Sequence, residues 1–195
     1  MKALQVVGRK KSGKTSLTLR LIPLLQGRGL RVGTVKHSSH PHPLDREGSD
    51  SWLHRKAGAE ATLAISAAAA TLHFDLPETE EAIQRLVEER LGHLDLVLIE
   101  GWSNRQGPKI EVLPADKEGR PREPRFLGSG DLIAAVLAPG LRPAPDALAP
   151  WKLELRSLGD SASSELRFSP DHCPAFHWED LQALTEWILS WHRTN

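Results

Sequence analysis

The chain has 195 residues and a mass of 21.5 kDa, and its 25 basic and 25 acidic side chains give no formal net charge. Hydrophobic residues make up 39% of the sequence, which is enough for a core and excludes wholesale disorder. The neutral balance disfavours a protein that binds nucleic acid by electrostatics. No apolar run approaches the roughly 18 residues of a membrane span.

The first half of the chain alternates between strand and helix patterns. Residues 3–7 are short, apolar and β-prone, which predicts a buried strand. Leucines at helical spacing then predict a helix over 14–26, kinked at Pro23. A second strand is expected at 31–36, and a polar loop rich in histidine and proline follows at 37–48.

Four further elements are expected before the next core strand. Ser49 can cap a short helix over 50–56. Two β-like stretches follow at 61–66 and 69–74, although their alanines weaken the strand propensity. A helix is expected to open at Pro77 and to run to about residue 91, with acidic residues near its positive end.

The second half begins with the stretch 94–99, whose apolar residues predict a buried strand more clearly than any other segment. Two further strands are expected at 109–113 and 132–138, on either side of an exposed loop, 114–131, that is punctuated by proline and glycine. The remaining features are a Pro-rich connection at 139–150, an edge strand at 151–156 and a last helix at 178–191.

This order of elements predicts an α/β fold with a mostly parallel sheet and helices on both faces. We expect a nucleotide-binding domain over 1–138 and a C-terminal extension over 139–195 that packs on it, in a single domain overall. The one cysteine, Cys173, can form no intrachain disulfide and is interpreted as a structural thiol. With no signal peptide expected at the N-terminus, the chain is predicted to be cytoplasmic.

Residues 8–15, Gly-Arg-Lys-Lys-Ser-Gly-Lys-Thr, match the phosphate-binding pattern G-x-x-x-x-G-K-[ST] in full. The match lies between a predicted strand and a predicted helix, which is the context of a P-loop NTPase-like fold. Lys14 is expected to reach the β- and γ-phosphates, and the Thr15 hydroxyl to ligate Mg²⁺. The predicted phosphate-binding residues are Gly8, Lys11, Ser12, Gly13, Lys14, Thr15 and Ser16.

A P-loop also needs a carboxylate at the end of another core strand, to hold the magnesium ion or its waters. Glu100 follows the predicted strand at 94–99, and Gly101 would let the backbone pass close to the γ-phosphate. The alternative is a solvated charge at a strand end. With Thr15, Glu100 is the predicted metal ligand, and with Lys14 and Asp45 it forms the predicted catalytic set.

The loop after the second strand gathers Lys36, His37, His40 and His42 close to Asp45. These histidines could bind a metal, contact a phosphate or other anion, or have no function. We predict nucleotide or substrate contacts for Lys36 and His37, and a role for Asp45 in sensing magnesium and the γ-phosphate.

The helix that follows carries two further basic residues, Arg55 and Lys56. They are predicted to meet a phosphate of a bound substrate, and a solvated helix face is the alternative.

Five stretches together resemble the molybdopterin-guanine dinucleotide biosynthesis adaptors, the MobB family. They are residues 8–15, 35–40, 45–51, 55–59 and 94–102. The resemblance covers roughly the first 113 residues and returns at 132–136.

The resemblance implies a P-loop protein that binds GTP with Mg²⁺ and has weak GTPase activity. It also implies a homodimer that assists MobA, the guanylyltransferase that attaches GMP to molybdopterin or Mo-molybdopterin. The guanine signature Asn-Lys-x-Asp is absent, and residues 137–140 read Leu-Ala-Pro-Gly where the family more often has Ser-Asp. Guanine preference is therefore implied by the resemblance and is not visible in these residues.

Two other functions fit the same P-loop. A small-metabolite kinase would usually add a mobile, Arg-rich lid, and residues 119–125 carry the arginines for one, although their prolines favour a fixed loop. In a non-catalytic scaffold the nucleotide would only stabilise the fold, and loss of Lys14 would leave cofactor production unchanged.

Overall fold

The computed structural model divides the chain into two compact units, residues 1–37 with 91–195, and residues 38–90. Each unit is described by itself. The described residues are 1–38, 43–117, 119, 121–126, 129–139, 141, 151–152, 154–155, 166–167 and 173–195. The predicted domain boundary at residue 138 stays a prediction, because much of 139–172 lies outside the described residues.

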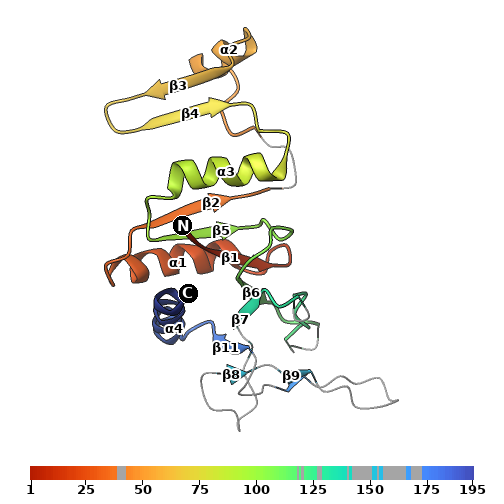
Figure 1. Ribbon diagram of the computed structural model, residues 1–195. Coiled ribbons are helices and arrows are strands. Elements are labelled where there is room, and N and C mark those ends of the chain that lie inside the picture. The colour runs from red at the N-terminus through yellow and green to blue at the C-terminus, as the bar shows by residue number, and fades with distance from the viewer. Residues whose placement is uncertain are drawn as a thin grey trace. The chain divides into compact units, whose positions relative to one another are not determined.

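The larger unit is built on a seven-stranded sheet (Figure 1). Six of its strands run parallel, and β8 at one edge runs antiparallel to β11. The sheet confirms the predicted P-loop NTPase-like α/β class. The strands lie in the order β2 (Val32–Lys36), β5 (Leu96–Glu100), β1 (Lys2–Gly8), β6 (Lys109–Leu113), β7 (Leu132–Leu137), β11 (Pro174–His177) and β8 (Trp151–Lys152).

The register of the parallel strands brings their ends together. Glu100 pairs with both Val6 and Lys36, and Gly8 pairs with Val112. The carboxyl ends of β1, β2, β5 and β6 therefore share one edge of the sheet, which is where open α/β sheets carry their ligands.

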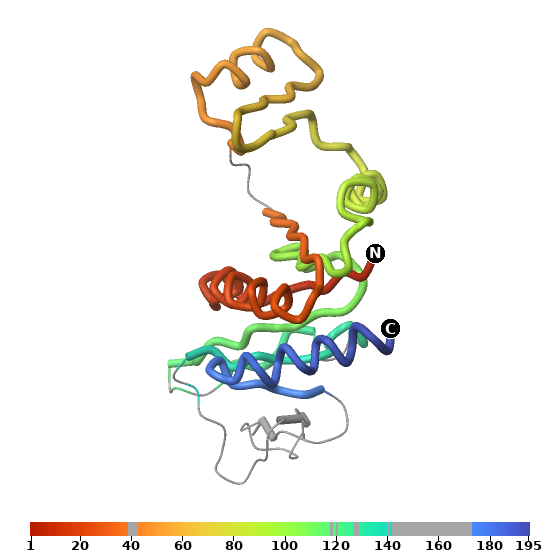
Figure 2. Tube along the Cα trace, turned by 90° about the vertical axis from the view of Figure 1, so that its left-hand side faces the viewer, coloured from red at the N-terminus to blue at the C-terminus, as the bar shows by residue number. Residues whose placement is uncertain are grey.

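Helices α1 (Lys14–Gln26) and α4 (Leu181–Thr194) pack together in the main hydrophobic core. Their apolar faces contact every second residue of the strands, because successive side chains of a strand point to opposite faces of the sheet. The two chain ends lie at the same end of this unit (Figure 2). Fully buried members of the core include Leu4, Val6, Leu17, Leu21, Leu98, Val112, Leu184 and Ile188.

A second apolar cluster includes Leu113, Leu137 and Cys173, with Phe126 packed against it. Burial, together with the nearby Glu111 carboxylate, raises the pKa of the Cys173 thiol to about 12. The thiol therefore stays protonated at neutral pH, which agrees with its interpretation as a structural residue.

The smaller unit contains helix α2 (Asp50–Lys56), the strands β3 (Ala61–Ile65) and β4 (Ala70–Phe74), and α3 (Glu80–Leu91) as far as Arg90. The two strands form a separate antiparallel hairpin. Among its described residues only Thr62 is buried. The large exposed hydrophobic side chains of this unit, among its described residues, are Leu44, Leu53, Leu63, Ile65, Leu72 and Leu76.

Two helices start later than predicted, and in both cases a capping side chain explains the difference. Helix α3 begins at Glu80 and not at Pro77, and the Thr79 hydroxyl accepts a hydrogen bond from the Ala82 N–H at 3.2 Å. Helix α4 begins at Leu181, and Asp180 accepts a hydrogen bond from the Ala183 N–H at 3.3 Å.

Two strand predictions are also revised. The strand β11 was not predicted, because its four residues include Pro174 and His177. The predicted edge strand at 151–156 is divided in two. β8 joins the main sheet, whereas β9 (Glu154–Leu155) pairs with β10 (Leu166–Arg167).

Candidate functional site

The phosphate-binding motif forms a tight loop between β1 and α1. Gly8 and Gly13 have φ angles of +143° and +99°, and Lys11 has one of +61°. A Cβ atom at Gly8 would lie 2.7 Å from the Val112 carbonyl oxygen, so a larger residue is excluded there. The loop has the backbone conformation that lets successive N–H groups converge on an anion.

Lys14 closes this loop through its side chain. Its ammonium group donates hydrogen bonds to the carbonyl oxygens of Gly8 at 3.1 Å and of Arg9 at 2.8 Å. Partial burial lowers the pKa of Lys14, and the Glu100 carboxylate opposes this shift, while the neighbouring Lys36 and Arg125 cations lower the pKa further. An anion bound in the loop would relieve this crowding of positive charge.

Ser12 is 3% exposed, and among the described residues its hydroxyl has no hydrogen-bond partner. A buried hydroxyl without a partner costs free energy. Because Ser12 lies within the phosphate-binding motif, a phosphate oxygen would satisfy it. The residues of the loop therefore fit a nucleoside phosphate.

Glu100 connects the loop to the neighbouring strands. Its Oε1 atom accepts a hydrogen bond from the Thr15 hydroxyl at 2.7 Å and also pairs with the Lys36 ammonium group. The Glu100 side chain is 8% exposed, whereas that of Lys36 is 61% exposed. A hydroxyl and a carboxylate side by side at the mouth of a P-loop are suitable ligands for Mg²⁺ or its waters.

The chain turns sharply after Glu100. Gly101 has a φ angle of +96°, and a Cβ atom there would lie 2.4 Å from the His37 carbonyl oxygen. The His37 N–H donates to the Glu100 carbonyl oxygen at 2.9 Å, and the rings of His37 and Trp102 stack with centroids 5.2 Å apart. The loops that leave β2 and β5 are therefore joined beside the P-loop.

Trp178 supports the other side of the P-loop. The ring lies 3.1 Å from where a Cβ atom of Gly13 would be, and the Arg20 guanidinium lies 5.6 Å from the ring centre. Trp178 is 7% exposed and belongs to the main hydrophobic core. Its contact with the loop carries no local sequence signal, because Trp178 is 165 positions away in the chain.

Asp45 belongs to the smaller unit. Its Oδ1 atom accepts hydrogen bonds from the hydroxyls of Ser49 at 3.1 Å and Ser51 at 3.2 Å, and His73 lies 3.9 Å from Oδ2. Burial acts to raise the pKa of Asp45, but these hydrogen bonds and His73 outweigh it, so that the pKa lies below its usual value. Asp45 is thus held ionised, and its predicted catalytic role stays a prediction.

Arg55 and Lys56 lie in the same smaller unit, in α2. Lys56 lies 5.4 Å from the Trp52 ring centre, and the buried Nε atom of Arg55 has no hydrogen-bond partner among the described residues. His40 and His42 lie outside the described residues. Within the described part of the chain no group of three or more His, Cys, Asp or Glu residues could hold a metal ion.

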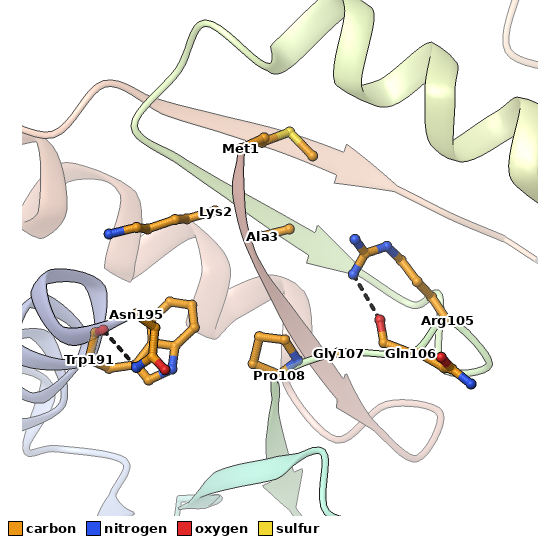
Figure 3. Close-up of a pocket in the computed structure, with 9 residues that line it drawn as sticks. All are labelled: Met1, Lys2, Ala3, Arg105, Gln106, Gly107, Pro108, Trp191 and Asn195. Carbon is orange, nitrogen blue, oxygen red and sulfur yellow. Dashed lines mark hydrogen bonds between the residues drawn. The ribbon is translucent and has the colours of Figure 1, made fainter.

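A pocket of the larger unit lies at the opposite edge of the sheet. Met1, Pro108 and Trp191 are among the nine residues that line it (Figure 3). These residues lie where β1 and β6 begin and where α4 ends. The pocket is therefore separate from the P-loop, which follows the last residue of β1.

A parallel sheet with a strand, a P-loop and a helix at its carboxyl edge defines a protein of the P-loop NTPase-like class. The sequence profile of the family described as "Molybdopterin guanine dinucleotide synthesis protein B" matches residues 3–138. The chain therefore belongs to the MobB family.

Curated relatives carry the corresponding name. The chain is 37% identical over 114 residues to the "Molybdopterin-guanine dinucleotide biosynthesis adapter protein" of Escherichia coli, and 34% identical over 107 residues to that of Haemophilus influenzae. These alignments cover 57% and 55% of this chain, and 65% and 60% of the relatives. The similarity thus spans less than two thirds of their length.

Solved structures share the fold over almost the whole chain. A crystal structure titled "molybdopterin-guanine biosynthesis protein B (mobB)" has a TM-score of 0.63 and 25% identity, and covers 98% of this chain and 99% of its own. The Bacillus subtilis MobB structure has a TM-score of 0.63 and 24% identity, with 97% of both chains covered.

In the part of this chain that the structure describes, no helix is long and apolar enough to cross a membrane.

Proposed function

We propose that this chain is an adaptor that binds GTP with Mg²⁺ and assists the attachment of GMP to molybdopterin or Mo-molybdopterin. Its partner would be the guanylyltransferase MobA, and the complex would work in the cytoplasm. The single observation that carries the nucleotide site is the Thr15–Glu100 hydrogen bond of 2.7 Å beside a complete P-loop. The pathway is proposed from the family and from the names of the relatives.

Different groups of the P-loop would bind different parts of the triphosphate. Backbone N–H groups of 8–15 and the start of α1 would receive the phosphates, and Lys14 would exchange its two carbonyl partners for phosphate oxygens. The Ser12 hydroxyl would gain the hydrogen bond that it lacks among the described residues. Three exposed cations, Arg9, Lys10 and Lys11, add positive charge to the same loop.

Thr15 and Glu100 would hold the magnesium ion or its waters. When bound, Mg²⁺ neutralises charge on the β- and γ-phosphates and orients them. Lys36 already supplies one positive charge to the Glu100 carboxylate. Lys36 would therefore move toward a phosphate when the metal takes its place.

Weak hydrolysis is consistent with the proposed adaptor role. Of the three predicted catalytic residues, Lys14 and Glu100 serve phosphate and metal binding in this proposal. Asp45 would have to bring its Oδ2 atom to an attacking water, while Oδ1 is held by Ser49 and Ser51. Slow turnover is therefore proposed from the family resemblance.

We include a homodimer in the proposal. The β3–β4 hairpin exposes Leu63, Ile65 and Leu72 to the extent of 58%, 74% and 39%. A unit with so few buried side chains needs a further apolar surface, and a second copy of the chain would supply one. Arg55 and Lys56 would then bind the phosphate of molybdopterin.

Reconstitution of guanine dinucleotide cofactor from molybdopterin, GTP and MobA tests this function. We expect addition of the chain to raise the yield, and Arg55→Glu with Lys56→Glu to abolish the increase. Arg85→Glu, an exposed arginine of α3, is the matched control and should behave as wild type. No increase with the wild-type chain would contradict the adaptor role, whereas phosphate transfer to a small metabolite would favour the kinase alternative.

A further inference from the structure

A buried carboxylate outside the P-loop holds the long connection between β6 and β7. Glu111, in the middle of β6, is 1% exposed. Its Oε2 atom accepts hydrogen bonds from the backbone N–H groups of Arg125 at 2.8 Å and Phe126 at 3.3 Å. A buried carboxylate is costly unless it is hydrogen-bonded, so these two bonds explain how Glu111 is tolerated there.

Neighbouring contacts anchor the same segment. Phe126 packs against the second apolar cluster, and the Lys109 ammonium lies 5.5 Å from the centre of its ring. Lys109 is itself 2% exposed and pairs with Asp131 at 2.7 Å, where the connection joins β7. The backbone at 125–126 is therefore held by contacts on both sides.

The anchor holds Arg125 close enough to the P-loop for its charge to act on Lys14. Glu111 pairs with Val7 of β1, one residue before the first glycine of the motif. The exposed Arg125 guanidinium lies beside the Phe126 ring, 5.4 Å from its centre. Arg125 is also one of the cations whose field lowers the pKa of Lys14. Burial raises the pKa of Glu111 above its usual value, although the two backbone hydrogen bonds and the Arg125 and Arg9 cations oppose this shift.

We propose that Arg125 is a further phosphate-binding residue, which contacts the terminal phosphate of the triphosphate in the P-loop, and that Glu111 is the positioning residue that presents it. This inference rests on the proposed GTP site. A guanidinium group suits the role because it stays charged and can donate two parallel hydrogen bonds to one phosphate. Its distance along the chain from the motif explains why the loop pattern alone does not reveal it.

The first experiment compares the binding of GTP and GDP by calorimetry in the presence of Mg²⁺. We expect Arg125→Ala to weaken GTP binding about tenfold and GDP binding at most about twofold. Arg122→Ala, which removes an exposed arginine of the same connection, is the matched control and should leave both affinities unchanged. Equal affinities in the Arg125 and Arg122 variants, or equal losses for GTP and GDP, would overturn the proposal.

The second experiment tests the positioning role of Glu111. Glu111→Ala should weaken GTP binding as Arg125→Ala does, with no further loss in the double variant, because both act through one contact. Glu111→Gln keeps an acceptor for the two N–H groups and should restore most of the affinity. Additive losses in the double variant would contradict the coupling between the two residues.

Nucleotide-free thermal unfolding shows whether each variant folds. If Glu111→Ala does not fold, the Arg125→Ala comparison alone decides the proposal. Failure of the wild-type chain to bind GTP would overturn the proposed function itself. Tight wild-type binding with an unaffected Arg125→Ala variant would overturn only this inference.

Discussion

The Thr15 hydroxyl donates a hydrogen bond of 2.7 Å to Glu100, although 85 positions separate the two residues in the chain. The contact exists because β1 and β5 are parallel neighbours whose carboxyl ends meet at one edge of the sheet. It joins the end of the phosphate-binding motif to a carboxylate on another strand. The proposed magnesium chemistry depends on this pair.

Glu100→Gln should therefore weaken GTP binding about tenfold with Mg²⁺ and at most about twofold without it. The amide keeps an acceptor for the Thr15 hydroxyl but loses the negative charge that a divalent cation needs. Calorimetric titration of GTP in magnesium and in chelator measures both affinities. Glu179→Gln, whose carboxylate is 70% exposed, is the control. Equal losses in the two buffers would show that Glu100 acts without the metal.

Asp95, at the opposite end of β5, should contribute to acid sensitivity. Arg31 donates to its carboxylate from the backbone N–H at 2.7 Å, and from Nε and Nη2 at 3.1 and 3.0 Å. These hydrogen bonds lower the pKa of Asp95 from 3.8 to about 2. A pKa that is lower in the folded state adds stability above its unfolded value, and this stability is lost as the pH falls toward the folded value.

We expect Asp95→Asn to lower the free energy of unfolding at neutral pH, and the difference from wild type to vanish as the pH falls from about 4 to about 2. Urea unfolding across this range measures the difference. Asp75→Asn, an exposed position in the smaller unit, should show no comparable trend. A difference that does not depend on pH would contradict the assigned pKa.

Much of the site follows from the sequence because its parts are local. Residues 8–15 contain both glycines, Lys14 and Thr15, so one continuous pattern predicts the loop, and the apolar run before Glu100 predicts its place at a strand end. The contacts that a single pattern does not predict join distant segments. Two examples are the contact of Trp178 with Gly13 and the hydrogen bond from the Arg125 N–H to Glu111. Both contacts depend on the strand order, which is a property of the whole sheet.

The helix starts and the smaller unit were harder to predict for other reasons. Proline is favoured at the first helical position, yet α3 begins at Glu80, three residues after Pro77, because the Thr79 hydroxyl caps it. In the β3–β4 hairpin, the alanines at 61, 64 and 67–70 supply little apolar area for packing. The sequence pattern there predicted strands but not which surface covers them.

The exposed hairpin leads to a prediction about the oligomeric state. Light scattering at micromolar concentration should give twice the 21.5 kDa mass of one chain, and Ile65→Asp should reduce it toward the single-chain value. Leu19, on α1 of the larger unit, is 65% exposed, so Leu19→Asp is a matched control that should leave the mass unchanged. A wild-type mass near 21.5 kDa, with and without nucleotide, would rule out the homodimer.

The central claim is that the loop at 8–15 binds GTP through Lys14. Titration of labelled GTP into the wild-type chain and into Lys14→Ala, both with Mg²⁺, tests it most directly. We expect tight binding by the wild type and a loss of at least about a hundredfold in the variant, with an unchanged thermal unfolding midpoint in the absence of nucleotide. Equal affinity of the two proteins for GTP would contradict the assignment of the phosphate site.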